Sequence, residues 1–432
     1  MNQNSHLRAL PASAARPGTF ERLESSVRSY CRSIPALFER AEGSHLIDRQ
    51  GRRYLDFLSG AGSMNYGHNH PVLAEALVDY IRDGGVAHSL DMHTAAKARF
   101  LEALEARILM PRKLDYRVQF TGPTGANGVE AAIKLARKVT GREGIVAFTN
   151  AFHGVTLGAL SLTGNQHHRG AAGVSMPGVL RAPFDGYLGA NVDTLDFLAR
   201  ALDDPSSGFG HPAAVIVETV QGEGGLNAAR LEWLQRLQAL CHEHDILLIA
   251  DDIQAGCGRT GTFFSFEPAG LNPDLVVLSK SLSGFGLPLA VLLIDPRLDQ
   301  WKPGEHNGTF RGNNHAFVTA TAALDHFWSS SDFSVGVVRR SQTVRARLAR
   351  IANEAAVPLA LRGRGLMSGL ACPDGELAAA VCRAAYRRGM VIETSGAHDE
   401  VVKCLPALNI DDELLSEGLD LLEESFRMAV KS

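Results

Sequence analysis

The segments that decide the fold are ILLIADDIQ at residues 246–254 and LVVLSKSLSG at residues 275–284. Each begins with a short apolar run and changes to polar residues where that run stops. Continuous apolar runs are typical of strands buried on both faces, and such strands belong mostly to parallel sheets covered by helices. The two segments therefore predict neighbouring strands of a parallel sheet, with polar side chains at their ends.

The same pattern recurs outward from these two segments. Their own apolar runs predict strands at residues 246–250 and 275–278. Further apolar runs predict strands at residues 117–121, 145–149, 213–217 and 290–294. Between the strands, apolar residues at helical spacing predict helices that include residues 129–139 and 231–241. This alternation of strand and helix predicts an α/β domain with a doubly wound, mostly parallel sheet.

Both ends of the chain depart from this alternation. Residues 20–75 contain a helix start, FERLESSVRSY, and a hairpin-like stretch, HLIDRQGRRYLDF, with a turn at Gln50 and Gly51. Residues 321–432 contain long amphipathic helices and a central strand, LRGRGLMSGLA. We predict that these two ends pack together as a smaller α+β domain beside a large domain of residues 76–320. Residues 1–19 are expected to form a disordered extension.

The composition narrows the class of protein. The 432 residues are 45% hydrophobic and 21% charged, as is usual for a folded chain of two or three domains. A net charge of −4 provides no basic surface for nucleic acid or anionic lipid, and no apolar run is long enough to span a membrane. The six cysteines form no CxxC pair, so we expect no disulfide framework, no metal site and a cytoplasmic location.

Two strand ends carry features that suit a flat, phosphorylated ligand. Ligands of open parallel sheets bind at the carboxyl ends of the strands. The turn GPTGANG opens a helix near Gly125 and Ala126, where free N–H groups and a positive dipole favour a phosphate, although a turn without a ligand is the alternative. Phe152 and His153 follow the strand at 145–149; the aromatic ring can stack on a ligand, or both side chains can belong to the core.

Two further strand ends carry charged side chains. Asp251 follows the strand at 246–250, where a buried carboxylate requires either an arginine or a ligand cation such as a protonated ring nitrogen. Lys280 follows the strand at 275–278 and is either a solvated surface lysine or a nucleophile whose pKa burial lowers. A phosphate turn, a stacking ring, a carboxylate and a lysine are together what pyridoxal 5′-phosphate (PLP) requires. The sequence therefore predicts a PLP site.

From Phe20 onward, the chain resembles the class III aminotransferases of PLP fold type I. The motifs that carry the resemblance are FHG (152–154), ETVQGEGG (218–225), DDIQAGCGRTG (251–261), PDLVVLSKSLSG (273–284), NGTFRGN (307–313) and RGRGLMSG (362–369). GHNHP, HSLDMHTAAK and VQFTGPTGANGVEAA are similar to one subgroup, the diaminobutyrate-type aminotransferases. The resemblance implies a ping-pong transfer of an amino group from L-glutamate to L-aspartate 4-semialdehyde. The products would be 2-oxoglutarate and L-2,4-diaminobutyrate, a precursor of ectoine and of some siderophores or peptides.

The resemblance also implies a role for each residue of the site. Lys280 would form the Schiff base with PLP and transfer the proton, and Asp251 would keep the pyridine nitrogen protonated. Thr309 would reach the phosphate bound by a neighbouring subunit, which implies a homodimer or higher oligomer with shared active sites. The remaining cofactor contacts would be Gly125 and Ala126 at the phosphate, Phe152 and Ile253 on the two ring faces, Gln254 at the ring hydroxyl, and His153.

Two positions differ from ornithine and GABA aminotransferases, the alternative within the family. Those relatives carry arginines where this chain has Val155 and Lys403, and the diaminobutyrate-type enzymes are similar to this chain at both. A lysine pairs with a carboxylate as a point charge rather than as a bidentate fork. Glu223 matches the gating glutamate of the family, so we expect Glu223 and Lys403 to form a switchable substrate-binding pair.

The sequence gives less support to functions outside the aminotransferases. A catalytically silent PLP-fold binding module would not require Lys280, Asp251 and Gln254, which are all present. A nicotinamide dehydrogenase would carry a GxGxxG turn after its first strand, and the turn here lacks that spacing. An aminomutase on the same fold is a related alternative that would not use 2-oxoglutarate.

Overall fold

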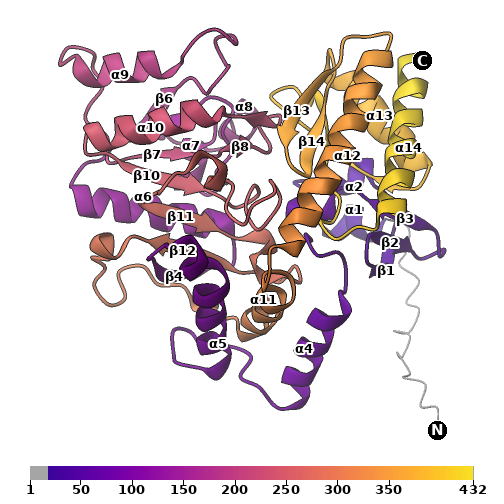
Figure 1. Ribbon diagram of the computed structural model, residues 1–432, viewed down its shortest axis with the longest axis horizontal. Helices are drawn as coiled ribbons and strands as arrows, with labels where there is room; N and C mark the ends of the chain where they lie inside the picture. The colour runs from indigo at the N-terminus through magenta and orange to yellow at the C-terminus, as the bar shows by residue number, and fades with distance from the viewer. Residues whose placement is uncertain (1–17, 432) are drawn as a thin grey trace.

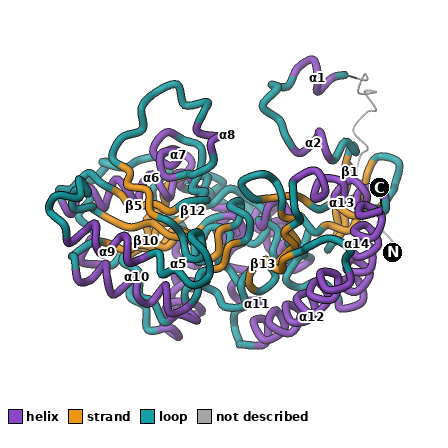
Figure 2. Tube along the Cα trace, turned by 90° about the horizontal axis from the view of Figure 1, so that it is seen from above, coloured by secondary structure: helices purple, strands orange, loops and turns teal. Residues whose placement is uncertain are grey.

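The computed structural model describes residues 18–431. The extension predicted at residues 1–19 lies outside the described residues except for Gly18 and Thr19. Thr19 begins α1 (Thr19–Leu23), and a second short helix, α2 (Tyr30–Ser33), follows it. Figure 2 shows both helices on a loop that stands away from the layers of the fold, and neither contains a buried residue.

Among the described residues, a seven-stranded sheet forms the centre of the larger part of the molecule (Figure 1). Its strands are β4 (Arg117–Gly122), β5 (Ile145–Phe148), β6 (Val179–Ala182), β7 (Ala214–Val217), β10 (Leu247–Asp251), β11 (Leu275–Leu278) and β12 (Ala290–Ile294). The spatial order is β4-β12-β11-β10-β7-β5-β6, and β12 is antiparallel to both neighbours while the other neighbouring pairs are parallel. The mostly parallel sheet is confirmed, and β6 is a strand that the sequence analysis missed.

Alternate residues of the central strands pack on opposite faces of this sheet. In β7, Val215 and Val217 belong to one hydrophobic cluster and Ala214 and Ile216 to another, and none is more than 1% exposed. The first cluster includes residues of α5 (Ala95–Leu104), α9 (Leu195–Asp203), α10 (Leu231–Glu243) and α11 (Asn314–Phe327). The second includes residues of α6 (Gly125–Thr140) and α7 (Leu157–Leu162). Burial of both faces explains why these strands are apolar along their length.

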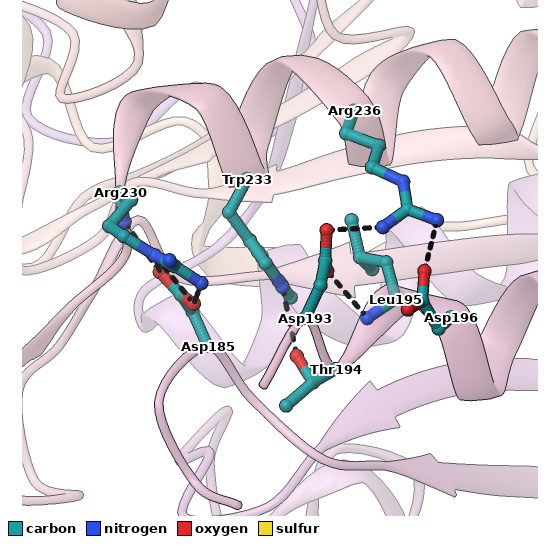
Figure 3. A network of polar contacts seen from close by, with 8 residues as sticks. All are labelled: Asp185, Asp193, Thr194, Leu195, Asp196, Arg230, Trp233 and Arg236. Carbon is teal, nitrogen blue, oxygen red and sulfur yellow. Dashed lines mark hydrogen bonds and ion pairs between the residues drawn. The ribbon is translucent and has the colours of Figure 1, made fainter. Parts of the chain in front are cut away.

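Ion pairs hold the start of α10 against the chain around α9 (Figure 3). Arg230 precedes α10 and donates to Asp185 from its backbone N–H at 2.8 Å and from its guanidinium at 2.6 Å. Arg236, inside α10, donates to both Asp193 and Asp196. These arginines are partly exposed, so each pair contributes at most about 1 kcal/mol and mainly orients the outer helices.

The C-terminal third forms an antiparallel sheet. Its strands are β13 (Ala360–Arg364), β14 (Met367–Ala371), β16 (Glu393–Ser395) and β17 (Val401–Cys404), and their spatial order is β13-β14-β17-β16. The prediction of one strand at LRGRGLMSGLA is wrong, because this stretch folds back on itself and pairs Arg364 with Met367. Gly365, between them, has a φ of +66°, a left-handed conformation that glycine adopts without steric cost.

The two chain ends pack together, as predicted. A third sheet consists of β1 (Phe38–Glu42), β2 (His45–Asp48), β3 (Arg53–Asp56) and β15 (Met390–Val391). In it, C-terminal β15 pairs in parallel with N-terminal β3. A hydrophobic cluster joins Leu55 and Phe57 to α12 (Asp332–Glu354), α13 (Gly375–Arg387) and α14 (Asp412–Lys431).

The predicted domain boundaries fall inside two helices that pack on each other. The boundary after residue 75 lies within α4 (Pro71–Arg82), and the boundary after residue 320 lies within α11. Where the domains divide therefore stays a prediction.

The remaining elements are short. They are α3 (Ser59–Gly62), α8 (Gln166–Arg169), β8 (Val220–Gln221), β9 (Asn227–Ala228) and single helical turns at Glu105–Leu109, Met110–Arg112, Glu267–Ala269, Lys280–Ser283, Pro296–Leu298 and Thr309–Arg311. Within residues 18–431, no helix combines the length and apolar character that crossing a bilayer requires.

Candidate active site

A cavity of about 530 Å³ lies at the carboxyl ends of the parallel strands. This volume is within the range of roughly 300–1,000 Å³ that small-molecule sites occupy. Of the predicted site residues, all of which are described, Thr309 and Lys403 are the two that do not line it. The other predicted site residues line it: Gly125, Ala126, Phe152, His153, Glu223, Asp251, Ile253, Gln254 and Lys280.

Asp251 is the last residue of β10 and is held in place by two contacts. Its Oδ2 lies 2.6 Å from Nδ1 of His153, and its Oδ1 accepts the backbone N–H of Ile253 at 3.2 Å. The Nε2 atom of His153 is buried and has no hydrogen-bond partner among the described residues. A carboxylate that is oriented in this way presents its charge to a cation in the cavity.

Glu218, directly after β7, is a second buried carboxyl at the same rim. It accepts the backbone N–H of Phe152 at 2.9 Å and that of Gly222 at 3.2 Å. Burial raises the pKa of Glu218 to about 7, against the opposing effect of His153. The sequence analysis missed this residue, although the reasoning that identified Asp251 applies to it, since Glu218 directly follows the predicted strand at 213–217.

Lys280 begins the helical turn after β11, and its φ of +50° lies in the left-handed region. Its Nζ donates to the carbonyl oxygen of Ala61 at 2.8 Å. Burial lowers the pKa of this amine, and Glu223 opposes that effect. Strained backbone at a buried amine is typical of a functional position, and a lysine with a lowered pKa is a better nucleophile and base.

The predicted phosphate turn is the start of α6. Thr124 caps the helix in a capping box with Asn127, and the helix begins at Gly125. The first N–H groups of a helix have no partner within it, so they suit an anion. A Cβ atom at Gly125 would lie 2.6 Å from Cδ1 of Ile253, so the absence of a side chain lets the turn approach Ile253 closely.

These groups fit PLP. The cavity offers the amine of Lys280, the carboxylate of Asp251 for a ring nitrogen, the apolar side chains of Phe152 and Ile253 for a ring, and the N-terminus of α6 at Gly125 for a phosphate. Each group matches a different part of the same small molecule.

Glu223 joins the cavity to Lys403. Oε1 of Glu223 accepts a hydrogen bond from Nε2 of Gln254 at 3.1 Å and one from Nζ of Lys403 at 2.9 Å. Gln254 also donates to the carbonyl oxygen of Ala61 at 2.9 Å. The two residues of the predicted pair are therefore in contact, and whether the pair switches stays a prediction.

Lys403 has a second carboxylate partner, Glu393, which the sequence analysis missed. Nζ of Lys403 lies 2.9 Å from Oε1 of Glu393, and the two residues face each other across β16 and β17. Burial alone would lower the pKa of Lys403, but the two glutamates raise it, and Lys403 with Lys280 lowers the pKa of Glu223 to about 2. No local pattern marks Glu393, because only the pairing of the two strands brings it to Lys403.

Thr309 lies apart from the cavity of its own chain. It is exposed, and its carbonyl oxygen lies 2.6 Å from Nε2 of His88. Its contact with a cofactor in a neighbouring subunit stays a prediction.

Comparisons with known proteins show the family to which the chain belongs. A family model described as aminotransferase class-III matches residues 27–426. A diaminobutyrate–2-oxoglutarate transaminase from Bordetella parapertussis is 59% identical over 94% of each chain, and one from Vibrio parahaemolyticus is 58% identical over 94% of this chain and 96% of its own. The crystal structure of an ornithine aminotransferase from Toxoplasma gondii ME49 has a TM-score of 0.84 at 25% identity, covering 98% of this chain and 99% of its own. The chain therefore belongs to the class III aminotransferase family.

Proposed function

We propose that this chain is a PLP-dependent diaminobutyrate–2-oxoglutarate transaminase. It would move an amino group between L-glutamate and L-aspartate 4-semialdehyde, reversibly forming 2-oxoglutarate and L-2,4-diaminobutyrate. The observation that carries the proposal is the meeting of Lys280 and Asp251 at adjacent strand ends of one cavity. The names of the Bordetella and Vibrio relatives, at 59% and 58% identity over nearly the whole chain, support the choice of substrate.

The residues would divide the chemistry among them. When bound, PLP supplies an electron sink for the carbon that carries the transferred nitrogen. Asp251, oriented by His153, would hold a proton at the ring nitrogen. Lys280 would hold the cofactor and act as the base that takes the proton from the substrate carbon, since burial lowers the pKa of its amine. Gly125 and Ala126 would bind the phosphate with their N–H groups.

Glu223 and Lys403 would adapt the site to its two substrates. When the α-carboxylate of glutamate binds Lys403, Glu223 would move aside; when the terminal carbon of diaminobutyrate reacts, the pair would close again. The contact of Glu223 with both Lys403 and Gln254 supports this role, because one side chain links the distal cation to the cofactor end of the cavity.

We also propose that two copies of the chain form shared active sites, with Thr309 reaching the phosphate bound by the partner. Exposed apolar side chains near Thr309 support this assembly: Met92 is 59% exposed and Phe310 is 67% exposed. A backbone hydrogen bond between Ser89 and Gly312 holds the two segments together. Large exposed apolar side chains on adjacent segments are typical of an interface.

The test is a substrate panel with purified protein and PLP. Amino donors are diaminobutyrate, 4-aminobutyrate and ornithine, with 2-oxoglutarate as acceptor, and glutamate formation is measured. We expect diaminobutyrate to have the highest kcat/KM. Preference for ornithine or 4-aminobutyrate would overturn the substrate assignment, and Lys280→Ala should lose turnover while the exposed Lys113→Ala control keeps it.

A further inference from the structure

The cluster of Glu223, Lys403 and Glu393 contains one amine between two carboxylates. Nζ of Lys403 lies 2.9 Å from an oxygen of each glutamate, and the lysine side chain is fully buried. The contact with Glu223 has hydrogen-bond geometry, whereas the contact with Oε1 of Glu393 is an ion pair that lacks this geometry. The Glu393 side chain is only 9% exposed, so a buried oxygen retains unused accepting capacity.

The charges of this cluster do not cancel. Two carboxylates and one ammonium leave one negative charge in surplus, and a buried unpaired charge is unfavourable. Among the described residues that line the cavity there is no arginine, and its lysine, Lys280, would be occupied by the cofactor. Burial and the nearby charge of Glu223 raise the pKa of Glu393, and Lys403 opposes both effects. A cation on the substrate would balance the surplus negative charge.

The substrate of the proposed function carries such a cation at its far end. When the C4 nitrogen of diaminobutyrate is at Lys280, its C2 ammonium group points away from the reacting carbon. Glu223 lines the cavity together with Lys280, and Lys403 lies 2.9 Å from both Glu223 and Glu393, so the cluster borders the path of the substrate. 4-Aminobutyrate has the same carbon chain and carboxylate, but it lacks the C2 ammonium group.

We propose that Glu393 is a specificity-determining residue which, with Glu223, binds the C2 ammonium group of diaminobutyrate and so selects α,ω-diamino acids over ω-amino acids of equal length. Lys403 keeps both carboxylates ionised and in position. In the glutamate half-reaction no ammonium group lies at this distance from the reacting carbon, so Glu393 there contacts Lys403 and not the substrate. This inference rests on the proposed function and assigns it a residue that discriminates between substrates.

The test is the ratio of kcat/KM for diaminobutyrate to kcat/KM for 4-aminobutyrate, both with 2-oxoglutarate. The wild-type ratio should exceed about 10, because a site built to bind an ammonium group disfavours an analogue without it. Glu393→Gln should reduce the ratio at least about 10-fold, because a charge-assisted hydrogen bond is lost.

Two controls separate the possible failures. Glu376→Gln, on an exposed residue of α13, should leave the ratio unchanged. Glu393→Asp retains the negative charge, so its ratio should be closer to the wild-type ratio than that of Glu393→Gln. A folded Glu393→Gln protein with the wild-type ratio would overturn the inference while leaving the proposed function intact. Wild-type protein that does not use diaminobutyrate would instead refute the proposed function, and the inference with it. Dissociation constants of both amino acids, measured calorimetrically on Lys280→Ala with and without Glu393→Gln, should show the same selective loss.

Discussion

Nδ1 of His153 lies 2.6 Å from Oδ2 of Asp251, and both side chains are almost completely buried. The two residues come from different strand ends, those of β5 and β10, and meet at the rim of the cavity. A histidine N–H at this distance stabilises the ionised carboxylate and fixes its direction. His153 is therefore a positioning residue for Asp251.

Replacement of His153 by Ala should lower kcat/KM about 10-fold, because Asp251 loses the contact that orients its carboxylate toward the cofactor. The check is the pH dependence of the absorption band of added PLP together with steady-state kinetics. A purely structural role would change the amount of folded protein and leave the spectral titration unaltered. The exposed His242→Ala variant is the control and should match the wild type in both measurements.

Replacement of Gly125 by Ala should weaken cofactor binding. The new Cβ atom would lie 2.6 Å from Cδ1 of Ile253, so either the turn or the isoleucine must move. We expect the dissociation constant for PLP, measured by fluorescence titration, to rise about 10-fold, which corresponds to about 1.4 kcal/mol. Gly210→Ala is a matched control, since a Cβ atom there meets nothing within 4 Å. Equal affinities for the two variants would contradict the proposed phosphate turn.

Asp252 predicts a pH-dependent stability. Burial raises its pKa from 3.8 to about 7, although its side chain accepts the backbone N–H of Ser265 at 3.0 Å. Between these two pKa values the folded chain keeps a proton that the unfolded chain has lost. The stability contributed by Asp252 therefore falls as the pH rises through this window.

Asp252→Asn cannot ionise and should remove that loss. The urea midpoint of the variant relative to the wild type should increase between a pH of about 5 and a pH of about 8. Asp83→Asn, at an exposed helix end, should show no such trend. A constant difference between Asp252→Asn and the wild type across this range would show that Asp252 does not titrate there.

Substitution of the buried Arg259 should reduce the free energy of unfolding more than substitution of an exposed arginine. It is fully buried and donates to Oδ1 of Asn65 at 3.1 Å and to the carbonyl oxygen of Leu366 at 3.2 Å, and it also donates to the carbonyl oxygen of Pro406. Arg259→Met would leave these acceptors unsatisfied, at a cost of about 3 kcal/mol or more in the free energy of unfolding. Denaturant titration measures this loss.

Arg259→Lys should restore little of that stability, because an ammonium group cannot replace a planar fork of donors. Arg82→Ala, on an exposed residue of α4, should change the free energy of unfolding by no more than about 0.5 kcal/mol. A similar loss in Arg82→Ala and Arg259→Met would show that the buried contacts of Arg259 contribute nothing specific.

The local pattern of the chain predicted the large sheet and the chemistry at its strand ends. A strand such as β7 is apolar on every residue because helices cover both faces, and that signal is carried by consecutive residues. Asp251 and Lys280 could be identified because parallel strands bring their carboxyl ends to one edge. Glu218 had the same signal and could have been identified by the same reasoning.

Other features depend on contacts between distant parts of the chain. The division of LRGRGLMSGLA into two strands depends on a turn at Gly365, and a run of apolar and small residues does not reveal where it reverses. The carbonyl oxygen of Ala61 reaches Lys280 from the N-terminal segment. Glu393 meets Lys403 only through the register of β16 and β17. Sequence alone therefore determined the strands of the large sheet other than β6 and which of their ends carry polar groups, because hydrophobic periodicity is local. Tertiary structure alone decided how many carboxylates surround Lys403, because strand register sets which distant side chains share one buried volume.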